Sequence, residues 1–481
     1  MKKTKIIATL GPATDREETL KEMIQAGTDI VRLNFSHGSR EEHHRRIAMV
    51  RKLSVELDIP VGILLDTKGP EIRTGEMEQG AVSLEDGQQV IVTTEEVTGT
   101  SQRFSVSWES LPEELHPGDS LLIDDGILRL SVEEIRQNQI LCRVVNGGVL
   151  HSRKGVNVPG VKVRLPAITE RDIEDIRFGL REGIDFIAAS FVRGREAIED
   201  IRELCHEEKK KVFLIAKIEN KEAVSAIDEI IDSADGIMIA RGDLGVEIPA
   251  EEVPYLQKKM IEKCNFRMKP VITATQMLDS MMRNPRPTRA EAADVANAIY
   301  DGTDAVMLSG ESAAGKFPVE SVKMMARIAE ETERHFQENV PGRQREIKSR
   351  VTIASTIAHM SVQAAQELHA SCILAPTMTG TTARYLSAFR PECVIVGMTP
   401  CTWVMRQMQL YWGVYPAAMT SISNTDELMT ATPGHVLEKG FAKEGEICVM
   451  TAGIAASKNS PYTTNMIRVF RMGEVPPDGT S

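Results

Sequence analysis

The chain has 481 residues, of which 42% are hydrophobic and 26% charged, and its formal net charge is −12. This length predicts about two or three domains, and the composition is typical of a soluble globular protein. The negative charge argues against nonspecific binding to nucleic acid, and no apolar run is long enough to predict a membrane span.

Eight short apolar runs recur along the first two thirds of the chain, and stretches with helical periodicity lie between them. The runs cover residues 4–10, 29–36, 61–67, 185–190, 212–219, 236–243, 270–276 and 304–311. Apolar runs without alternation suit parallel strands that are buried on both faces. Eight strand–helix units therefore predict a closed (β/α)8 barrel, the TIM barrel.

Polar side chains end every one of these runs. In a TIM barrel the carboxyl ends of the strands form the rim that carries the active site. Any one such residue could cap a helix or lie in a solvated loop, but eight coinciding runs favour a common site. The residues are Thr9, Asn34, Ser36, Asp66, Thr67, Ser190, Lys217, Glu219, Asp243, Thr275, Ser309 and Glu311.

The strand–helix alternation is interrupted once and later resumes in a second form. Short strands and Gly-rich turns predict a small inserted β-barrel domain over residues 71–165, which Gly- and Pro-rich segments join to the TIM barrel as a lid. The TIM barrel is then expected to comprise residues 1–70 and 166–340. From residue 341 to 481, beginning with a polar linker, the pattern predicts a separate doubly wound α/β domain.

Lys217 and Glu219 end the fifth run, two residues apart, so in an extended strand their side chains share one face. Glu219 and Asp243 end neighbouring strands, which lie about 5 Å apart in a sheet. Two such carboxylates can hold one hard cation such as Mg²⁺. The alternative, which the pattern leaves open, is a structural ion pair of Glu219 with Lys217 or Arg241.

A second group of rim residues offers neutral oxygens. Arg32, Asn34 and Ser36 alternate along the second run and share one face, and Arg is suited to bidentate binding of a phosphate or carboxylate. With Asp66 and Thr67 on the next strand, they would form an oxygen-rich cage with one full negative charge. Such a cage suits a monovalent cation better than Zn²⁺, although a plain hydrogen-bond network between the strands is the alternative.

The stretch PTMTGTTARYL, residues 376–386, places four threonines and a glycine between a strand and a helix. A helix N-terminus presents free N–H groups and a positive dipole end to anions, and the hydroxyls add donors. The pattern favours a phosphate site built from Thr377, Thr379, Gly380, Thr381 and Thr382. Ordinary N-capping, which needs one hydroxyl, is the alternative.

Together, several stretches resemble the pyruvate kinase family and keep its order. They are TLGPA, VRLNFSHG, LLDTKGPEIRTG, KGVNVPG, KIEN, IARGDLGVEIP, ATQMLDSM, NPRPTRAEAADVANA and DGTDAVMLSGESAAGKFP. The resemblance extends to about residue 475 and indicates a bacterial-type member without an N-terminal extension or an extra C-terminal domain. It implies a phosphotransferase that converts phosphoenolpyruvate and ADP to pyruvate and ATP, with Mg²⁺ or Mn²⁺ and K⁺ as cofactors.

The resemblance also implies roles for individual residues in catalysis and substrate binding. Lys217 matches the family's catalytic lysine, and Arg32 matches its phosphate-binding arginine. Thr275 matches a threonine beside the carbon that must be protonated. Gly242 and Asp243 match the residues that offer backbone N–H groups to the substrate carboxylate.

The cation and nucleotide sites follow from the same resemblance. Glu219 and Asp243 match the ligands of the divalent metal. The K⁺ site matches Asn34, Ser36, Asp66 and Thr67, and the nucleotide site matches Arg73, Lys154, Asn34 and His37. His37 is also open to the simpler interpretation of a loop histidine.

Further expectations concern regulation and context. Family members that need no monovalent cation tend to have Lys where this chain has Glu71, so activity is expected to depend on K⁺. The residues from Thr377 to Thr382 lie where regulated members hold an effector phosphate, and a sugar phosphate or AMP would fit. The family is usually homotetrameric. Seven scattered cysteines without a C-x-x-C motif predict reduced thiols and a cytoplasmic location.

Two other functions are compatible with parts of the pattern. One is a metal-dependent, enolate-forming barrel lyase, which would need no nucleotide lid and no counterpart of Lys217. The other is a catalytically inactive scaffold that only senses metabolites. Loss of a metal ligand or of the lysine would mark such a scaffold, and every one of these residues is present.

Overall fold

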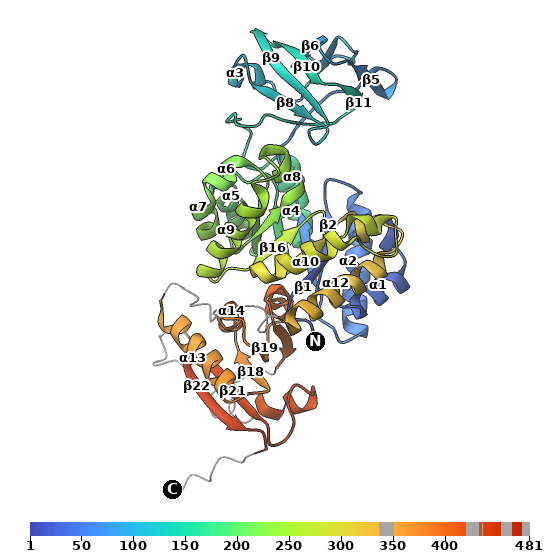
Figure 1. Ribbon diagram of the computed structural model, residues 1–481. Coiled ribbons are helices and arrows are strands. Elements are labelled where there is room, and N and C mark those ends of the chain that lie inside the picture. The colour runs from blue at the N-terminus through green and yellow to red at the C-terminus, as the bar shows by residue number, and fades with distance from the viewer. Residues whose placement is uncertain (336–350, 420–431, 435, 454–463, 474–481) are drawn as a thin grey trace.

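The computed structural model describes residues 1–335, 351–419, 432–434, 436–453 and 464–473. Figure 1 shows three parts stacked on one another: the inserted β sheets at the top, the barrel in the middle and the C-terminal sheet at the bottom. The expected linker 341–350 lies outside the described residues. Within the described part of the chain, no helix combines the length and apolar character needed to cross a bilayer.

The predicted TIM barrel is confirmed. Its strands are β1 (Lys5–Thr9), β2 (Ile30–Asn34), β3 (Gly62–Asp66), β13 (Phe186–Ala189), β14 (Phe213–Ile218), β15 (Gly236–Ala240), β16 (Val271–Ala274) and β17 (Ala305–Leu308). They close in the order β1-β17-β16-β15-β14-β13-β3-β2, and all neighbours are parallel. Every residue of these strands is buried except two half-buried ones in β2, as expected of strands covered on both faces.

Helices surround this barrel. They are α1 (Glu17–Gln25), α2 (Arg40–Glu56), α4 (Glu170–Glu182), α5 (Glu196–Glu207), α6 (Lys221–Ser225), α7 (Ile227–Ser233), α8 (Arg241–Glu247), α9 (Val253–Phe266), α10 (Arg289–Asp301), α11 (Gly310–Ala313) and α12 (Pro318–Arg334). Thr169 and Thr288 cap the N-termini of α4 and α10 with their side chains. Gly183 and Gly302 end the same helices in the left-handed conformation, which returns the chain to the next strand.

The inserted segment lies between β3 and β13 and has a core of its own. Its elements are β4 (Ile72–Arg73), β5 (Ala81–Leu84), β6 (Gln89–Thr93), β7 (Arg103–Ser105), α3 (Leu111–Glu114), β8 (Ser120–Ile123), β9 (Leu128–Arg136), β10 (Gln139–Asn146), β11 (Gly148–His151) and β12 (Gly155–Asn157). Seven strands form one sheet in the order β4-β12-β8-β9-β10-β6-β7, and β11 pairs with β5. The two strands at its roots, β4 and β12, pair with each other, so both connections to the barrel leave from one place.

The C-terminal part is the predicted doubly wound α/β domain. Its elements are α13 (Ile353–Glu367), β18 (Cys372–Pro376), α14 (Thr381–Ala388), β19 (Val394–Thr399), α15 (Thr402–Gln407), β20 (Val414–Ala418), β21 (Ile447–Gly453) and β22 (Thr464–Arg471). The sheet order is β20-β19-β18-β21-β22, with only β22 antiparallel. Strand order reverses beside β18, which is the switch point where such sheets bind ligands.

The base of the barrel packs directly on the C-terminal domain. Asp185 accepts hydrogen bonds from Arg406 Nε at 2.6 Å and from Arg51 Nη2 at 2.8 Å, and its side chain is 1% exposed. Lys5 Nζ donates to the Val414 carbonyl at 2.5 Å. One continuous apolar cluster extends from the barrel interior into the C-terminal sheet. These contacts make the two parts a single packed unit.

Candidate active site

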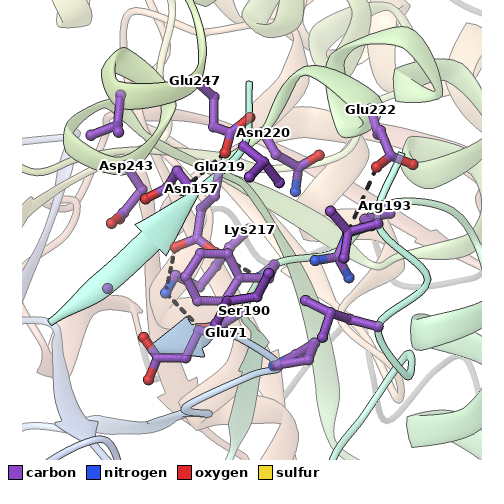
Figure 2. A pocket seen from close by; sticks show the side chains of 18 of the residues that line it. Glu71, Asn157, Ser190, Arg193, Lys217, Glu219, Asn220, Glu222, Asp243 and Glu247 are labelled. Atoms are coloured by element: carbon purple, nitrogen blue, oxygen red, sulfur yellow. Dashed lines mark hydrogen bonds and ion pairs between the residues drawn. The ribbon is translucent and has the colours of Figure 1, made fainter. Parts of the chain in front are cut away.

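A cavity of about 1170 Å³ lies at the carboxyl ends of the barrel strands. It extends between the rim and the roots of the inserted domain, so residues from both parts line it. Figure 2 shows Lys217 and Glu219 near its centre, with Asp243 on one side and Glu71 below them. The lining is rich in charged side chains of both signs, which suits a charged substrate and its counter-ions.

Lys217 lies near the C-terminal end of β14, and its ammonium is held by three partners. Its Nζ is 2.8 Å from Glu219 Oε1 and 3.1 Å from Asp66 Oδ1, and it donates to Ser190 Oγ at 2.7 Å. Burial opposes the charge, but Asp66 and Glu219 outweigh it and raise the pKa of Lys217. The side chain is therefore a fixed cation and cannot act as a proton acceptor.

Glu219 follows the last residue of β14 and is almost fully buried. Its Oε2 accepts the backbone N–H of Phe191 at 2.6 Å. Burial, reinforced by the negative charge of Asp243, raises the pKa of Glu219 to about 7 despite the adjacent Lys217. Two carboxylates beside one cavity mark a place where a bound cation would relieve their repulsion.

The ion pair that the sequence left open forms between Glu219 and Lys217. Arg241 is bound instead to Asp294, with two contacts of 2.7 Å. Glu219 and Asp243 nevertheless line the same cavity, with Asp243 pointing into it from the start of α8. The described residues contain no group of three or more His, Cys, Asp or Glu side chains arranged to hold a metal. A pair of carboxylates fits Mg²⁺, which keeps other positions for substrate oxygens and water.

The residues expected to bind K⁺ are brought together at and just beyond the C-terminal ends of β2 and β3. Asn34 is the register partner of Asp66, and its side-chain oxygen accepts the Ser36 N–H at 3.1 Å. Asp66 binds Arg32 Nε at 2.5 Å, and Thr67 Oγ1 accepts the Ser190 N–H at 3.0 Å. Asn34 and Ser36 line the cavity, whereas Asp66 and Thr67 lie behind them.

Asp66 connects the Arg32 guanidinium to the Lys217 ammonium. Burial disfavours its charge, but Arg32 and Lys217 more than compensate and lower the pKa of Asp66. Arg32 also donates to Thr9 Oγ1 at 3.1 Å. These contacts fix the Arg32 guanidinium at the cavity wall, next to the Lys217 ammonium.

The cations expected to contact the nucleotide stand at the two roots of the inserted domain. Arg73 forms two hydrogen bonds with Glu71, at 2.7 and 2.9 Å, and Lys154 donates to Asp124 at 2.8 Å. Both side chains line the cavity, together with the exposed His37. Each root cation is therefore already neutralised by a carboxylate of the same inserted segment.

Thr275 and Gly242 lie beside the cavity without lining it. The Thr275 hydroxyl accepts the Gly242 N–H at 2.7 Å and donates to the Ala274 carbonyl at 2.6 Å. Thr275 has φ 68°, in the left-handed region that β-branched residues avoid. Such backbone strain persists where the surroundings impose it, and it concentrates at functional sites.

The hydroxyl groups in the threonine-rich segment, residues 377–382, have different hydrogen-bond partners. Thr377 Oγ1 accepts the Gly380 N–H at 3.0 Å, which closes a tight turn in which Gly380 has φ 80°. The hydroxyls of Thr379 and Thr381 lie 2.9 Å apart, whereas Thr382 is buried and bonded to Thr464 at 2.8 Å. The four hydroxyls therefore do not converge on a single point.

Two features of the cavity were given no specific role from the sequence. Ser190 ends a predicted strand, so its position at the rim was visible, but its bonds to Lys217 and Asp66 were not. Asn157 at the root of the inserted domain donates to Glu247 on α8 at 2.9 Å. This bond joins residues 90 positions apart, and no local pattern indicates it.

Comparisons with known proteins agree with this architecture. The profile described as pyruvate kinase, barrel domain, matches residues 1–322, and the profile described as pyruvate kinase, alpha/beta domain, matches residues 355–470. A pyruvate kinase of Geobacillus stearothermophilus is 48% identical over 477 residues, which is 98% of this chain and 81% of the relative. A pyruvate kinase of Staphylococcus epidermidis is 47% identical over 480 residues, with the same coverage.

A solved structure gives the same result. The crystal structure of a pyruvate kinase from Cryptosporidium parvum matches with a TM-score of 0.89 and 37% identity, covering 98% of this chain and 96% of that one. These findings confirm the resemblance indicated by the sequence motifs and the phosphotransferase function that it implies. The chain belongs to the pyruvate kinase family.

Proposed function

We propose that the rim cavity transfers the phosphoryl group of phosphoenolpyruvate to ADP, giving pyruvate and ATP, the last step of glycolysis. The observation that carries this assignment is the position of the Lys217 ammonium. It is held by Asp66 and Glu219 at the wall of a cavity that also contains Arg32 and Asp243. Fixed cations and positioning supply most of the catalysis in phosphoryl transfer.

In the reaction, the bond between phosphorus and the enol oxygen breaks while a β-phosphate oxygen of ADP bonds to phosphorus. Lys217 supplies a point charge to the oxygens of the travelling phosphoryl group. Arg32 holds the same group from the neighbouring wall by its guanidinium. Since the pKa of Lys217 is raised, its charge persists throughout turnover.

Glu219 and Asp243 are the residues that would hold Mg²⁺ or Mn²⁺. When bound, the divalent ion supplies positive charge to the substrate oxygens. Asn34, Ser36, Asp66 and Thr67 would hold K⁺, which requires Asp66 to share its oxygens between the ion and Arg32.

The enolate left after transfer takes a proton at its methylene carbon and becomes pyruvate. Thr275 lies beside the cavity, and its hydroxyl is fixed by Gly242 and Ala274. A hydroxyl is a weak acid, so its role is to orient a donor water and not to donate alone. The Gly242 and Asp243 N–H groups would donate hydrogen bonds to the substrate carboxylate. This requires the Gly242 N–H to break its hydrogen bond with Thr275 Oγ1.

The inserted domain, residues 71–165, acts as a lid. Arg73, Lys154, Asn34 and His37 surround the space between lid and rim, where the phosphates of ADP would lie. On closing, the lid excludes water that would otherwise hydrolyse the phosphoryl donor. When the lid closes, Arg73 gives up its contact with Glu71, and Lys154 its contact with Asp124, and both bind the nucleotide phosphates instead.

The remaining proposals concern assembly and control. The loop from Thr377 to Thr382 binds an effector phosphate, from a sugar phosphate or AMP, and the chain works in the cytoplasm as a homotetramer. The family assignment supports each of these.

The test is ATP formation from phosphoenolpyruvate and ADP, followed by a coupled assay with Mg²⁺ and K⁺ present. Stoichiometric ATP and pyruvate are expected. An enolate-forming lyase would give no ATP, and an inactive scaffold would give no product. Either result would overturn the assignment.

A further inference from the structure

A second cavity, of about 290 Å³, lies where the base of the barrel meets the C-terminal domain. The barrel contributes the C-terminal part of α5 and the segment that leads into β14, including Phe213 and Leu214. The C-terminal domain contributes the start of α14, part of α15 and Tyr411. Because β14 begins here and ends at the rim, this cavity is separate from the one that contains Lys217.

The walls of this cavity are basic. Its lining includes Arg202, His206, Lys210, Lys211 and Arg384, against the single carboxylate of Asp235. That carboxylate is already engaged by Arg202 at 3.4 Å and by the Leu214 N–H at 2.9 Å. In a chain with a net charge of −12, such a local excess of positive charge attracts small anions.

Three of these cations have no anionic partner in the described part of the chain. Lys210, Lys211 and Arg384 take part in none of its ion pairs or side-chain hydrogen bonds. The Lys211 ammonium lies 5.8 Å from the centre of the Trp403 ring, and the Arg384 guanidinium lies 5.4 Å from the centre of the Tyr385 ring. Both cations are positioned by aromatic rings, which leaves their N–H donors available.

Tyr411 adds a buried donor. The residue is 4% exposed, and its ring packs edge-on against Phe213 with centroids 6.2 Å apart. Its hydroxyl makes no hydrogen bond with the described residues and is not among their fully enclosed unpaired atoms. Tyr411 is one of the residues that line the cavity. A buried phenol without a partner is unusual in a folded protein.

The start of α14 completes the wall. Thr379 and Thr381 line the cavity, with their hydroxyls 2.9 Å apart, and the first turn of the helix has N–H groups that no residue of the helix can accept. Thr377 and Thr382 do not line it. Only the barrel-facing side of the threonine-rich loop therefore belongs to this cavity.

We propose that this cavity binds a small phosphate-bearing anion between the barrel and the C-terminal domain. The Arg384 guanidinium can hold two phosphate oxygens at once, while Lys210 and Lys211 supply charge from the barrel side. Tyr411, Thr379 and Thr381 supply hydroxyl donors. The volume is at the lower end of the range for ligand sites, about 300 Å³, which suits inorganic phosphate or a small phosphate monoester. The site does not depend on the proposed phosphoryl transfer. It extends the proposed effector site at the threonine-rich loop to a cavity that residues of both the barrel and the C-terminal domain line.

The experiment is calorimetric titration of the full-length chain with inorganic phosphate, in a phosphate-free chloride buffer. Lys217→Met is introduced throughout, so that phosphate binding at the rim is weakened and catalytic failure does not enter the result. The same titration with a hexose monophosphate and with a nucleoside 5′-monophosphate identifies which of the three phosphate compounds binds most tightly.

Two sets of variants test the assigned donors. Arg384→Gln is expected to weaken binding about tenfold or more, and Tyr411→Phe about threefold, as for loss of a charged and a neutral hydrogen bond. Lys210→Gln with Lys211→Gln alters exposed side chains only, so its loss of affinity cannot come from misfolding. Lys323→Gln, an exposed lysine on α12 with the same charge change, is the control and should bind like the parent.

Either of two results would overturn the proposal. It is wrong if none of the three phosphate compounds binds to the parent. It is also wrong if the double lysine variant and Arg384→Gln bind phosphate as tightly as the Lys323→Gln control.

Discussion

Lys217 Nζ lies 2.8 Å from Glu219 Oε1, so the cation and anion at the C-terminal end of β14, one on either side of its last residue, are in direct contact before any ligand enters. Replacing Lys217 with Met keeps the length of the side chain and removes its charge. We expect kcat to fall about a hundredfold to a thousandfold, as when one fixed charge-stabilising donor is removed from an active site. Steady-state kinetics measure this loss, and circular dichroism checks the fold. Lys323→Met on the outer face of α12 should retain full activity, and near-normal turnover of Lys217→Met would contradict the mechanism.

Glu219→Gln tests the metal site separately. The amide has almost the same shape as the carboxylate but no charge, and it retains an oxygen that can accept the Phe191 N–H. We expect the Mg²⁺ concentration at half-maximal activity to rise about tenfold or more, because one charge-assisted ligand is lost, and kcat to fall at saturating Mg²⁺. Glu222→Gln, on the far side of the same cavity, changes charge without touching the proposed ligands. An unchanged Mg²⁺ requirement in Glu219→Gln would exclude Glu219 as a ligand.

Activity should depend on K⁺. Glu71 lies at the cavity wall with Arg73 and Lys68 as its partners, at 2.7 and 3.3 Å. When Arg73 turns to the nucleotide, Glu71 adds negative charge that a bound monovalent cation would offset. Replacing K⁺ with tetramethylammonium, which is too large for the oxygen cage, should remove most of the turnover. Glu71→Lys should retain activity without K⁺, and full turnover of the parent in K⁺-free buffer would refute the prediction.

The buried Lys5 should make the free energy of unfolding depend on pH. Burial at the contact between the barrel and the C-terminal domain lowers the pKa of Lys5 from 10.5 to about 8, although Asp29 partly opposes the shift. Between these pH values the unfolded chain binds one more proton than the folded chain, so stability rises as the pH increases. The rise attributable to Lys5 is about 3 kcal/mol.

Urea unfolding of the parent and of Lys5→Met at pH 7.5 and above measures this effect. The variant removes the group that titrates, so it should lack this part of the rise. It should also be the more stable of the two near pH 7.5, where the parent keeps a buried ammonium. Parallel curves for the two proteins would show that Lys5 is not perturbed.

The contact between barrel and C-terminal domain should be sensitive to Asp185. This carboxylate is 1% exposed and holds Arg51 and Arg406 together. Asp185→Asn leaves two guanidinium groups against a neutral side chain, and breaking a buried pair typically costs about 3–5 kcal/mol. The urea midpoint measures the loss. Glu174→Gln, which removes the exposed partner of Arg40, should cost less than about 1 kcal/mol, and equal losses in the two variants would contradict the argument.

The barrel could be predicted from the sequence because its strands are buried on both faces and therefore appear as unbroken apolar runs. The neighbouring positions of Lys217 and Glu219 followed from the two-residue period of a strand. The strained backbone of Thr275 could not be predicted, since no glycine or turn motif marks it. The bond between Asn157 and Glu247 was equally hidden, because it joins two segments that only the folded chain brings together.

The second cavity was also beyond the reach of the sequence. The threonine-rich loop indicated an anion site, but Lys210 and Tyr411 come from opposite sides of a contact between domains. Basic residues at the end of a helix, as in α5, are ordinary on a protein surface. Their meaning depends on what packs against them, and that information is absent from local patterns.

β14 passes through the whole barrel, with Phe213 at the base cavity and Lys217 four residues further along at the rim. A strand rises about 3.3 Å per residue, so the two residues are only about 13 Å apart along an element that cannot stretch. A closed barrel has no free edge, and β14 cannot slide without dragging β13 and β15. A ligand bound in the base cavity would therefore contact a strand whose other end carries the Lys217 ammonium.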